Sequence, residues 1–408
     1  MECFQYLQNA TGDLIVNLPV GYGKSIIYHL LPQIIESNVN KPVVIVISPL
    51  NIIQKDQLTS IKQHKINACR VNIKGCIDDG DEGFLYELYS NDSNLDSIKS
   101  GEYTIILTHP EALLNTSKGR ELLNDEDFQG HVIGIAIDEC HIIEKWGAEF
   151  RTAYQKLGSL KSFFPNVPII ALSGTLTEKQ KNDLPKQLNL QNYKIIEASP
   201  DKPNIFLSKF EKPTASDVAY SYEQIFHKEC DNLYKEQEMY PVTLMFLPVY
   251  YLSQALVYLQ TLFGSQTIES SIFSALCSGQ DKHVIDTTID ELRKENPRIR
   301  LVLTTSIAGM GFDPKNVTRI VHTCPPRSLS QYLQEIGRAG RRGQPSEAIL
   351  YFSNRDIAKN LPGITEDIIL YCKNKTSCLR NNLLSVFGFT KDEPFLDKCC
   401  SFCNKESQ

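Results

Sequence analysis

The feature that most constrains the fold of this chain is a repeated type of short apolar run. Each run is rich in β-branched side chains and is nearly uninterrupted by polar residues. Such runs are typical of strands buried on both faces of a parallel sheet, whereas a strand with one solvent-exposed face alternates apolar and polar residues. The segments between the runs are long enough for the crossover helices that parallel strands require, so we expect an α/β lobe. In the first half of the chain the runs are Leu14–Leu18, Val43–Ile47, Thr104–Leu107, Val132–Ile137 and Ile169–Leu172.

A second set of runs predicts a second α/β lobe. The turn-rich stretch Ala198–Asn204 separates the two sets and is a candidate hinge. From about Asn354 the chain is cysteine-rich. Because 408 residues are too many for one core, we predict three domains, at residues 1–199, 200–353 and 354–408. The runs of the second set are Val242–Leu247, Leu301–Thr304, Arg319–Val321 and Ala348–Phe352.

The net charge of −6 argues at first sight against a protein that binds nucleic acid. The acidity is concentrated, however, because Lys74–Asp127 holds 13 acidic and 4 basic residues. Within it, the polar stretch Cys76–Ser97 is predicted to be a surface insertion. The charge therefore does not exclude DNA as a partner.

The sequence predicts an intracellular protein. No apolar run is long enough to span a bilayer, and Met1–Ala10 lacks the basic-then-apolar layout of a signal peptide. In a reducing compartment, the 12 cysteines are expected to be thiols or metal ligands rather than disulfides.

The first run leads into a glycine-rich loop, LPVGYGKS, which an apolar helical segment follows from Ile26. Gly21 and Gly23 would let backbone N–H groups approach a phosphate, Lys24 would reach the β- and γ-phosphates, and the Ser25 hydroxyl would hold Mg²⁺. The loop departs from the strict phosphate-loop pattern at its first glycine position. The alternative interpretation is a glycine-rich turn between a strand and a helix, with a lone lysine.

An acidic pair follows the run Val132–Ile137 directly. Asp138 would hold Mg²⁺ through water, and Glu139 would orient or deprotonate the water that attacks the γ-phosphate. His141 would link the state of the nucleotide to the rest of the lobe. Taken alone, the pair could also be the acidic N-cap of a helix.

A phosphate loop followed by Asp-Glu-x-His resembles helicase superfamily 2, and EKWGAEFRTAY narrows the resemblance to the RecQ-like ATP-dependent DNA helicases. In that family, an aromatic-rich loop after the acidic motif senses single-stranded DNA and couples it to hydrolysis. The residues that match it are Trp146, Gly147, Phe150, Arg151 and Tyr154. The alternative is that Trp146 and Phe150, four apart, form one apolar face of a helix.

Further matches follow in the family's order and cover nearly the whole chain. Two resemble motifs that contact the DNA backbone, and three resemble motifs III, V and VI. The resemblance implies two tandem RecA-like lobes with a small C-terminal zinc-binding subdomain, and it gives Ser173, Thr175 and Gln334 a part in coupling. The matching stretches are Ile47–Leu50, Thr108–Leu113, Ser173–Thr175, Thr304–Asp313 and Gln331–Gly343.

The last of these stretches holds two arginines that could neutralise charge on the γ-phosphate when the lobes close on ATP. Arg338 and Arg341 are three apart and share a face if the segment is helical. We favour Arg341 as the arginine finger and Arg338 as its partner. A solvated basic turn, or a patch that contacts DNA phosphates, is the alternative.

The cysteines near the end of the chain predict a zinc site, because Zn²⁺ takes four tetrahedral ligands and a C-x-x-C pair supplies two of them. Cys400 and Cys403 form that pair, and Cys378 is expected to be the third ligand. The fourth is either Cys399 or Cys372. Unligated thiols in a frayed tail are the alternative.

Taken together, the sequence predicts an ATP- and Mg²⁺-dependent 3′–5′ helicase that acts on single-stranded and duplex DNA in repair or recombination, in the nucleus or cytoplasm. The glutamine that reads adenine in RecQ-like enzymes would fall at about Met1, so we expect GTP to be accepted nearly as well as ATP. Two alternatives remain. One is a degenerate DNA-binding paralogue with weak ATPase activity, and the other is an RNA helicase.

Overall fold

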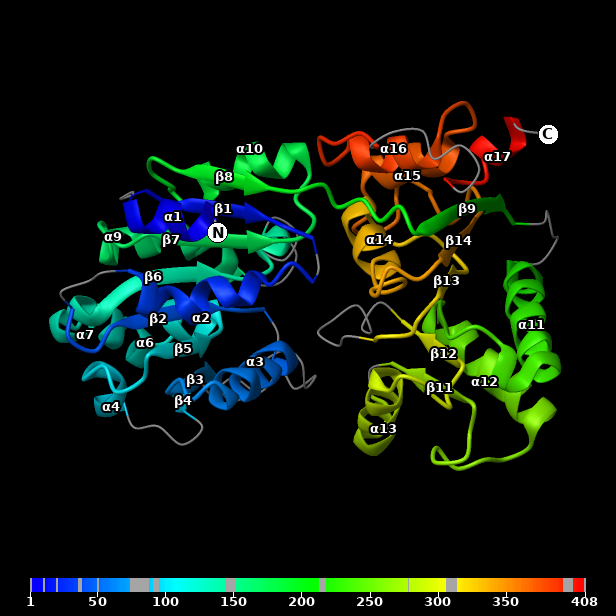
Figure 1. Cartoon of the computed structure of the whole chain (residues 1–408), viewed down its shortest axis with the longest axis horizontal. Helices are drawn as coiled ribbons and strands as arrows, with labels where there is room; N and C mark the ends of the chain where they lie inside the picture. The colour runs from blue at the N-terminus through cyan, green and yellow to red at the C-terminus, as the bar shows by residue number, and fades with distance from the viewer. Residues whose placement is uncertain are drawn as a thin grey trace. The chain divides into compact units, whose positions relative to one another are not determined.

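The chain forms two compact units, Met1–Pro200 and Asp201–Gln408, in a computed structural model (Figure 1). Among the described residues, no helix combines the length and the apolar composition that a membrane span needs. The structure describes residues 2–9, 12–19, 21–35, 39–49, 51–73, 88–90, 95–143, 152–212, 218–277, 279–305, 314–391 and 399–406.

Unit 1 is built on an eight-stranded sheet with the order β4-β3-β5-β2-β6-β7-β1-β8. Every neighbouring pair is parallel except β3 and β4. The five strands expected from apolar runs are β1, β2, β5, β6 and β7, and all five lie in the interior of this sheet. The strands are β1 (Leu14–Asn17), β2 (Val43–Ile47), β3 (Ala68–Ile73), β4 (Leu88–Ser90), β5 (Ile105–Thr108), β6 (Val132–Ile137), β7 (Ile169–Ser173) and β8 (Lys194–Glu197).

Both faces of this sheet are covered, which explains why the runs are continuous rather than alternating. Ile15 and Ile45 belong to one buried cluster, whereas Leu14 and Val44, next to them in sequence, belong to the cluster on the other face. The second of these faces packs against α1 (Glu2–Asn9), α2 (Lys24–Ile34) and α3 (Asn51–Gln63). The first packs against α4 (Leu95–Lys99), α5 (Pro110–Leu114), α6 (Ser117–Leu123), α7 (Glu126–His131), α9 (Leu160–Phe163), α10 (Glu178–Gln187) and the 3₁₀ helix η3 (Thr152–Ser159).

Unit 2 has a six-stranded, wholly parallel sheet with the order β11-β12-β10-β13-β14-β9. Helices again cover both faces, so the prediction of a second α/β lobe is confirmed. The strands are β9 (Ile205–Glu211), β10 (Thr243–Phe246), β11 (Phe273–Leu276), β12 (Leu301–Thr304), β13 (Arg319–His322) and β14 (Ser346–Phe352). The helices that pack on the sheet are α11 (Val218–Glu236) and α12 (Val249–Phe263) on one face and α13 (Lys282–Arg293), α14 (Leu329–Ile336), α15 (Glu366–Lys373) and α16 (Leu379–Ser385) on the other.

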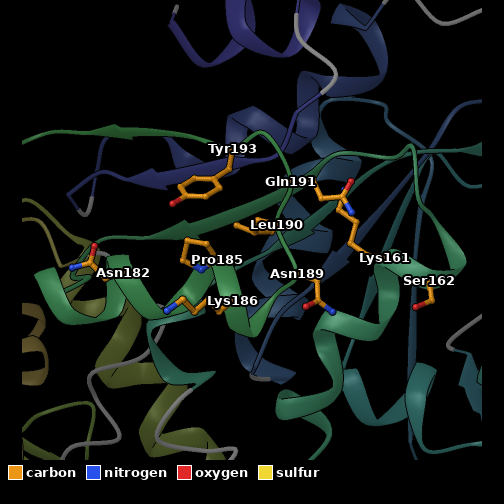
Figure 2. A pocket seen from close by; sticks show the side chains of 9 residues that line it. All are labelled: Lys161, Ser162, Asn182, Pro185, Lys186, Asn189, Leu190, Gln191 and Tyr193. Atoms are coloured by element: carbon orange, nitrogen blue, oxygen red, sulfur yellow. The ribbon is translucent and has the colours of Figure 1, made fainter.

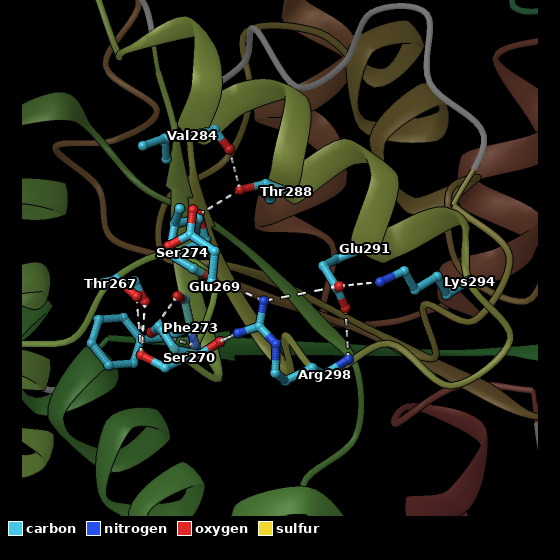
Figure 3. A network of polar contacts seen from close by, with 12 residues as sticks. Thr267, Glu269, Ser270, Phe273, Ser274, Val284, Thr288, Glu291, Lys294 and Arg298 are labelled. Carbon is cyan, nitrogen blue, oxygen red and sulfur yellow. Dashed lines mark hydrogen bonds and ion pairs between the residues drawn. The ribbon is translucent and has the colours of Figure 1, made fainter.

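A polar network fastens α13 to the segments before β11 and β12 (Figure 3). Glu291 accepts a hydrogen bond from the backbone N–H of Arg298 at 3.0 Å, and the Arg298 guanidinium donates to the carbonyl of Ile268 at 2.9 Å. The hydroxyls of Ser274 and Thr288 lie 2.6 Å apart in the buried interface between β11 and α13. The carboxylate of Glu291 is therefore used to hold the fold.

The cysteine-rich end does not have a core of its own. Ile368 on α15 and Leu383 on α16 belong to the same buried cluster as Leu244 and Ile320 of the sheet. The last segment also adds to the sheet edge, where Leu207 of β9 forms a parallel bridge with Cys400. Residues 354–408 are thus packed into unit 2 as a small layer on one face and one edge of its sheet.

Candidate nucleotide site and cysteine cluster

The glycine-rich loop joins β1 to α2 at the carboxyl edge of the sheet, the edge at which open α/β sheets bind ligands. Gly21 and Gly23 have φ values of +94° and +72°, which residues with a side chain rarely adopt. Helix α2 begins at Lys24, two residues earlier than expected. The Lys24 ammonium group donates to the carbonyls of Leu18 at 2.9 Å and Pro19 at 3.4 Å, so it folds back over the loop.

The Ser25 hydroxyl lies in the first turn of α2 and has a partner that the sequence analysis missed. Nε2 of Gln57, on α3, donates to Ser25 Oγ at 3.0 Å. No residue spacing announces this contact, because α2 and α3 are separated by β2.

The acidic pair lies at the same edge, at the end of β6. The backbone N–H of Asp138 donates to the carbonyl of Ile47 at 2.8 Å, which ties this position to the end of β2. Burial, and secondarily the charge of Glu139, raise the pKa of Asp138 to about 7, while the charge of Lys24 opposes the shift. A buried carboxylate offers hard oxygen ligands that suit Mg²⁺, and a cation would stabilise its charged form.

Glu139 of this pair forms a connected group with His141 and Ser173. Glu139 has a φ of +51°, a strained conformation that often occurs at functional sites. Nδ1 of His141 lies 3.2 Å from Glu139 Oε2 and 3.2 Å from Ser173 Oγ at the end of β7. The backbone N–H of Thr175 donates to Ser173 Oγ at 3.2 Å. The structure thus brings together four residues that the sequence analysis selected from two separate stretches.

Two further polar side chains support this group and were not anticipated. Asn17, buried at the end of β1, accepts a hydrogen bond from the backbone N–H of Leu176 at 3.1 Å. Gln180 donates to the carbonyl of His141 at 3.1 Å and closes a capping box with Thr177 at the start of α10. The T-x-x-Q pattern is a helix-start signal, so the sequence could have revealed Gln180 as a capping residue but not as a partner of His141.

Part of the predicted coupling machinery lies outside the described residues. This applies to Trp146, Phe150 and Arg151, and to residues 306–313 of the motif V stretch. Tyr154, in contrast, is buried in η3 as a core residue of unit 1.

In unit 2, the two arginines of the motif VI stretch follow a helix rather than lying on it. Helix α14 ends at Ile336, and Gly340 has a φ of +63°. The condition under which Arg338 and Arg341 would share a helical face is therefore not met. Arg338 is buried and Arg341 is half-buried in the turns that follow α14, whereas Gln334 lies in the last turn of the helix.

The start of unit 2 holds this arginine turn in place. Nδ2 of Asn204 donates to the carbonyls of Gly340 and Gln344, at 2.9 Å each. A Cβ atom at position 340 would stand 2.2 Å from that same nitrogen, so only glycine fits. The ammonium of Lys202 donates to the carbonyl of Gly337. The expected hinge is Ala198–Asn204, and Lys202 and Asn204 in its second half thus form hydrogen bonds within unit 2.

Four cysteine sulphur atoms converge at the end of unit 2, and they belong to Cys378, Cys399, Cys400 and Cys403. All four lie within 4.8 Å of one another. The Cys378 sulphur is 3.5 Å from that of Cys399 and 3.8 Å from that of Cys400, and the Cys400 and Cys403 sulphurs are 3.6 Å apart. Tetrahedral Zn²⁺ with Zn–S bonds of about 2.3 Å places its sulphur ligands about 3.8 Å apart, so the cluster fits this ion.

Of the two candidates for the fourth ligand, the cluster contains Cys399. Cys372 is buried in α15 outside the cluster. Hydrogen bonds from the Cys378 and Cys399 thiols lower the pKa of Cys400, whereas hydrogen bonds with Cys378 and Cys400 raise the pKa of Cys399. Among the described residues, the other cysteines belong to no such group.

Arg380 connects the cysteine cluster to the start of unit 2. Its buried guanidinium contacts Asp201 Oδ1 at 2.5 Å and donates to the carbonyl of Lys202 at 3.0 Å. It also donates to the carbonyl of Cys399 at 3.2 Å. One side chain therefore joins α16, the cysteine segment and the residues before β9.

A separate hollow on unit 1 is lined by Lys161, Tyr193 and several amide side chains (Figure 2). Lys161 pairs at 2.7 Å with the buried Asp13, which directly precedes β1. This contact places the hollow at the amino ends of the strands, opposite the glycine-rich loop. Asp13 also accepts from the backbone N–H groups of Ile169 at 2.7 Å and Gln191 at 2.6 Å. The charge of Lys161 is thus used inside the fold.

Comparisons with known proteins agree with this architecture. The DEAD/DEAH box helicase family model matches residues 1–184, and the helicase conserved C-terminal domain model matches residues 232–343. The ATP-dependent DNA helicase RecQ of Pasteurella multocida is 27% identical over 414 residues, covering 96% of this chain and 57% of that protein. The chain spans between 26% and 64% of the length of eight such curated relatives.

Solved structures share the fold at low sequence identity. The DUF1998 helicase MrfA bound to DNA and AMPPNP matches with a TM-score of 0.63 and 18% identity, over 86% of this chain and 47% of that one. The DEAD-box helicase Mss116 bound to single-stranded RNA matches with a TM-score of 0.61 and 15% identity, over 96% of this chain and 76% of that one. The two family models therefore identify a DEAD/DEAH box helicase domain in residues 1–184 and a helicase conserved C-terminal domain in residues 232–343, and RecQ DNA helicases are relatives of the chain along nearly its whole length.

Proposed function

We propose that this chain is the motor of an ATP-dependent 3′–5′ DNA helicase. The observation that carries the proposal is the convergence of Lys24, Ser25, Asp138, Glu139 and His141 at the carboxyl edge of the unit 1 sheet. A loop that presents helix N–H groups and an ammonium, next to a buried acidic pair, suits a nucleoside triphosphate with a divalent cation.

In this proposal each residue of unit 1 has a distinct task. The N–H groups around Gly21 and Gly23 and the Lys24 ammonium bind the phosphates, while Ser25 and Asp138 hold Mg²⁺. Bound MgATP supplies a phosphoanhydride bond whose cleavage can be coupled to motion. Glu139 orients the attacking water and takes its proton, and its contact with His141 positions it. Ser173 connects His141 to the end of β7.

Unit 2 is proposed to supply positive charge to the transferred phosphoryl group. The turn after α14 carries Arg338 and Arg341, and Asn204 and Lys202 hold its backbone. We assign Arg341 as the finger and Arg338 as its partner. Gln334, in the last turn of α14, is proposed to couple nucleotide and strand. The cysteine cluster is proposed to hold one Zn²⁺ with a structural role.

DNA is favoured over RNA as the track because the relatives that match nearly the whole chain are named DNA helicases. The fold does not separate the two, since its solved neighbours are bound to DNA in one case and to RNA in another. The 3′–5′ direction, a role in repair or recombination and a nuclear location are part of the same proposal and rest on the resemblance to RecQ-like enzymes. The degenerate binding paralogue is less favoured, because the chain keeps the lysine and serine of the phosphate loop and both residues of the acidic pair.

The experiment that tests this function is ATP hydrolysis with and without single-stranded DNA. We expect strong stimulation by DNA, and a loss of rate of at least about 100-fold in Glu139→Gln with nucleotide binding retained. Glu126→Gln, an exposed glutamate at the start of α7, is the matched control and should behave as the native chain.

Two outcomes would overturn the proposal. Tight DNA binding without turnover in the native chain would indicate a binding paralogue. Stimulation by RNA together with unwinding of RNA duplexes, but not of matched DNA duplexes, would indicate an RNA helicase.

A further inference from the structure

Helix α3 lies between a loop at the end of β2 and the nucleotide loop. It begins at Asn51, two residues after Pro49. Ser48 and Pro49 belong to a stretch proposed to contact the DNA backbone. The fully buried Gln54 locks the first turns of α3 to this loop, because its Nε2 donates to the carbonyl of Ser48 at 3.1 Å. Its Oε1 accepts hydrogen bonds from Arg70 at 3.3 Å and Asn72 at 2.8 Å, both on β3.

Gln57 is three residues further along α3 and therefore on the same face. Its side chain reaches across to α2, where it donates to Ser25 Oγ at 3.0 Å. Ser25 and His29 are four apart and share one face of α2. Burial lowers the pKa of His29 to about 4, so the imidazole on this face is neutral near pH 7. Two glutamines on α3 thus link the two loops: Gln54 contacts Ser48, and Gln57 contacts Ser25.

The contact with Gln57 restricts what the serine hydroxyl can do. A hydroxyl has one hydrogen to donate and two lone pairs that accept. Because the amide of Gln57 occupies one lone pair, the other lone pair and the hydrogen have defined directions. A metal ligand held in this way binds more tightly than one that must give up rotational freedom on binding.

We propose that Gln57 is a positioning residue for Ser25. It orients the hydroxyl toward Mg²⁺ and, through α3, makes that orientation sensitive to a strand bound at Ser48 and Pro49. This inference rests on the proposed function, because it requires a nucleotide site at Ser25 and a strand at the β2 loop. A simple brace between α2 and α3 is the competing interpretation, and it predicts no particular effect on Mg²⁺.

The test is the binding of a fluorescent ATP analogue, titrated with Mg²⁺ in the presence and absence of single-stranded DNA. Gln57→Met keeps the length of the side chain and removes the donor without adding a charge, and Gln57→Ala removes both oxygen and nitrogen. We expect each to raise the Mg²⁺ concentration for half-saturation about five-fold, the effect of one hydrogen bond, with Mg²⁺-free nucleotide affinity unchanged. Gln63→Ala, an exposed glutamine on the same helix, is the control and should match the native chain.

DNA provides the second readout. Single-stranded DNA should lower the half-saturating Mg²⁺ concentration of the native chain and of Gln63→Ala, but not that of the Gln57 variants. A native Mg²⁺ dependence in both Gln57 variants would overturn the inference. Equal losses of Mg²⁺-free nucleotide affinity and of thermal stability would overturn it in favour of the brace.

Failure of the proposed function has a different signature. A native chain that binds no nucleotide, or a Ser25→Ala variant with the native Mg²⁺ dependence, would remove the nucleotide site itself, whatever Gln57 does.

Discussion

The nucleotide loop of unit 1 and the cysteine cluster of unit 2 are assembled in different ways. In the loop, five consecutive residues from Gly21 to Ser25 set the geometry, and the left-handed glycines make it a local property of the backbone. In the cluster, Cys378 opens α16 and the other three sulphurs come from the segment that pairs with β9. The nucleotide loop is thus formed by consecutive residues, whereas the cysteine cluster is formed by residues that are distant in the sequence.

This difference has an energetic consequence. The polar groups of the loop have partners in the protein, such as the carbonyls that accept from Lys24 and the amide that donates to Ser25. The cluster instead crowds four sulphurs within 4.8 Å, and four thiolates without a cation would repel one another. The fold of unit 2 should therefore depend on a metal, whereas the fold of unit 1 should survive loss of its ligand.

The largest expected effect is that of metal removal. We expect one zinc ion per chain, contributing up to about 10 kcal/mol to the stability of the folded segment. Chelation should lower the unfolding midpoint of unit 2 and leave nucleotide binding by unit 1 intact, as measured by metal analysis, thermal unfolding and analogue binding. Cys399→Ser should lose the metal and Cys372→Ser should keep it. The same metal loss in both variants would contradict the cluster.

The next effect tests how the cluster is anchored. Arg380→Met removes a buried guanidinium that pairs with the half-buried Asp201 and donates to Cys399, so we expect a loss of about 3–5 kcal/mol from unit 2. Faster amide hydrogen exchange in α15 and α16, with unchanged exchange in unit 1, would show this loss of stability. Arg355→Met, at an exposed arginine of the same unit, should have little effect. Comparable effects of the two substitutions would mean that Arg380 does not anchor the cluster.

A third prediction concerns the loop itself. Lys24→Ala removes the ammonium assigned to the phosphates, so the affinity for ATP should fall about 100-fold, or about 2.7 kcal/mol. The zinc content and the unfolding midpoint of unit 2 should not change. Lys62→Ala, at an exposed lysine on α3, serves as the control in the same calorimetric titration. Native affinity in Lys24→Ala would break the assignment of the loop.

The smallest expected effect is at the arginine turn. Gly340→Ala imposes a side chain at positive φ and against Asn204, so we expect a loss of about 1–3 kcal/mol and slower ATP turnover with native nucleotide affinity. Gly343 also has a positive φ, but a Cβ there meets nothing within 4 Å. Gly343→Ala therefore separates backbone strain from the clash. Equal turnover in the two variants would show that contact with Asn204 does not position the arginines.

How much of the fold could be predicted depended on where each strand lies in its sheet. The runs at β2, β6 and β12 were predicted with their observed bounds, and all three are interior strands. The missed strands include β4, β8, β9 and β11, which are the outermost strands of the two sheets. An edge strand has only one neighbour and part of its surface meets solvent, so polar residues interrupt its apolar pattern, as in IFLSKFE of β9.

The candidate sites divide in the same way. Lys24, Asp138, Glu139 and the C-x-x-C pair follow from contiguous motifs, because their spacing alone carries the chemistry. The sequence left open the choice between Cys399 and Cys372, and it left open whether the segment that holds Arg338 and Arg341 is helical.

By itself, then, the sequence determined the two α/β lobes and the short motifs, because burial on both faces and local backbone geometry are encoded in neighbouring residues. Only the tertiary structure decided the cross-chain contacts, which include Gln57 on Ser25, Asn204 on Gly340 and Arg380 between Asp201 and Cys399. Each contact joins residues that lie on separate elements and meet only when those elements pack together. A hydrogen bond between them depends on the distance and angle of the side-chain atoms, which no local sequence pattern specifies.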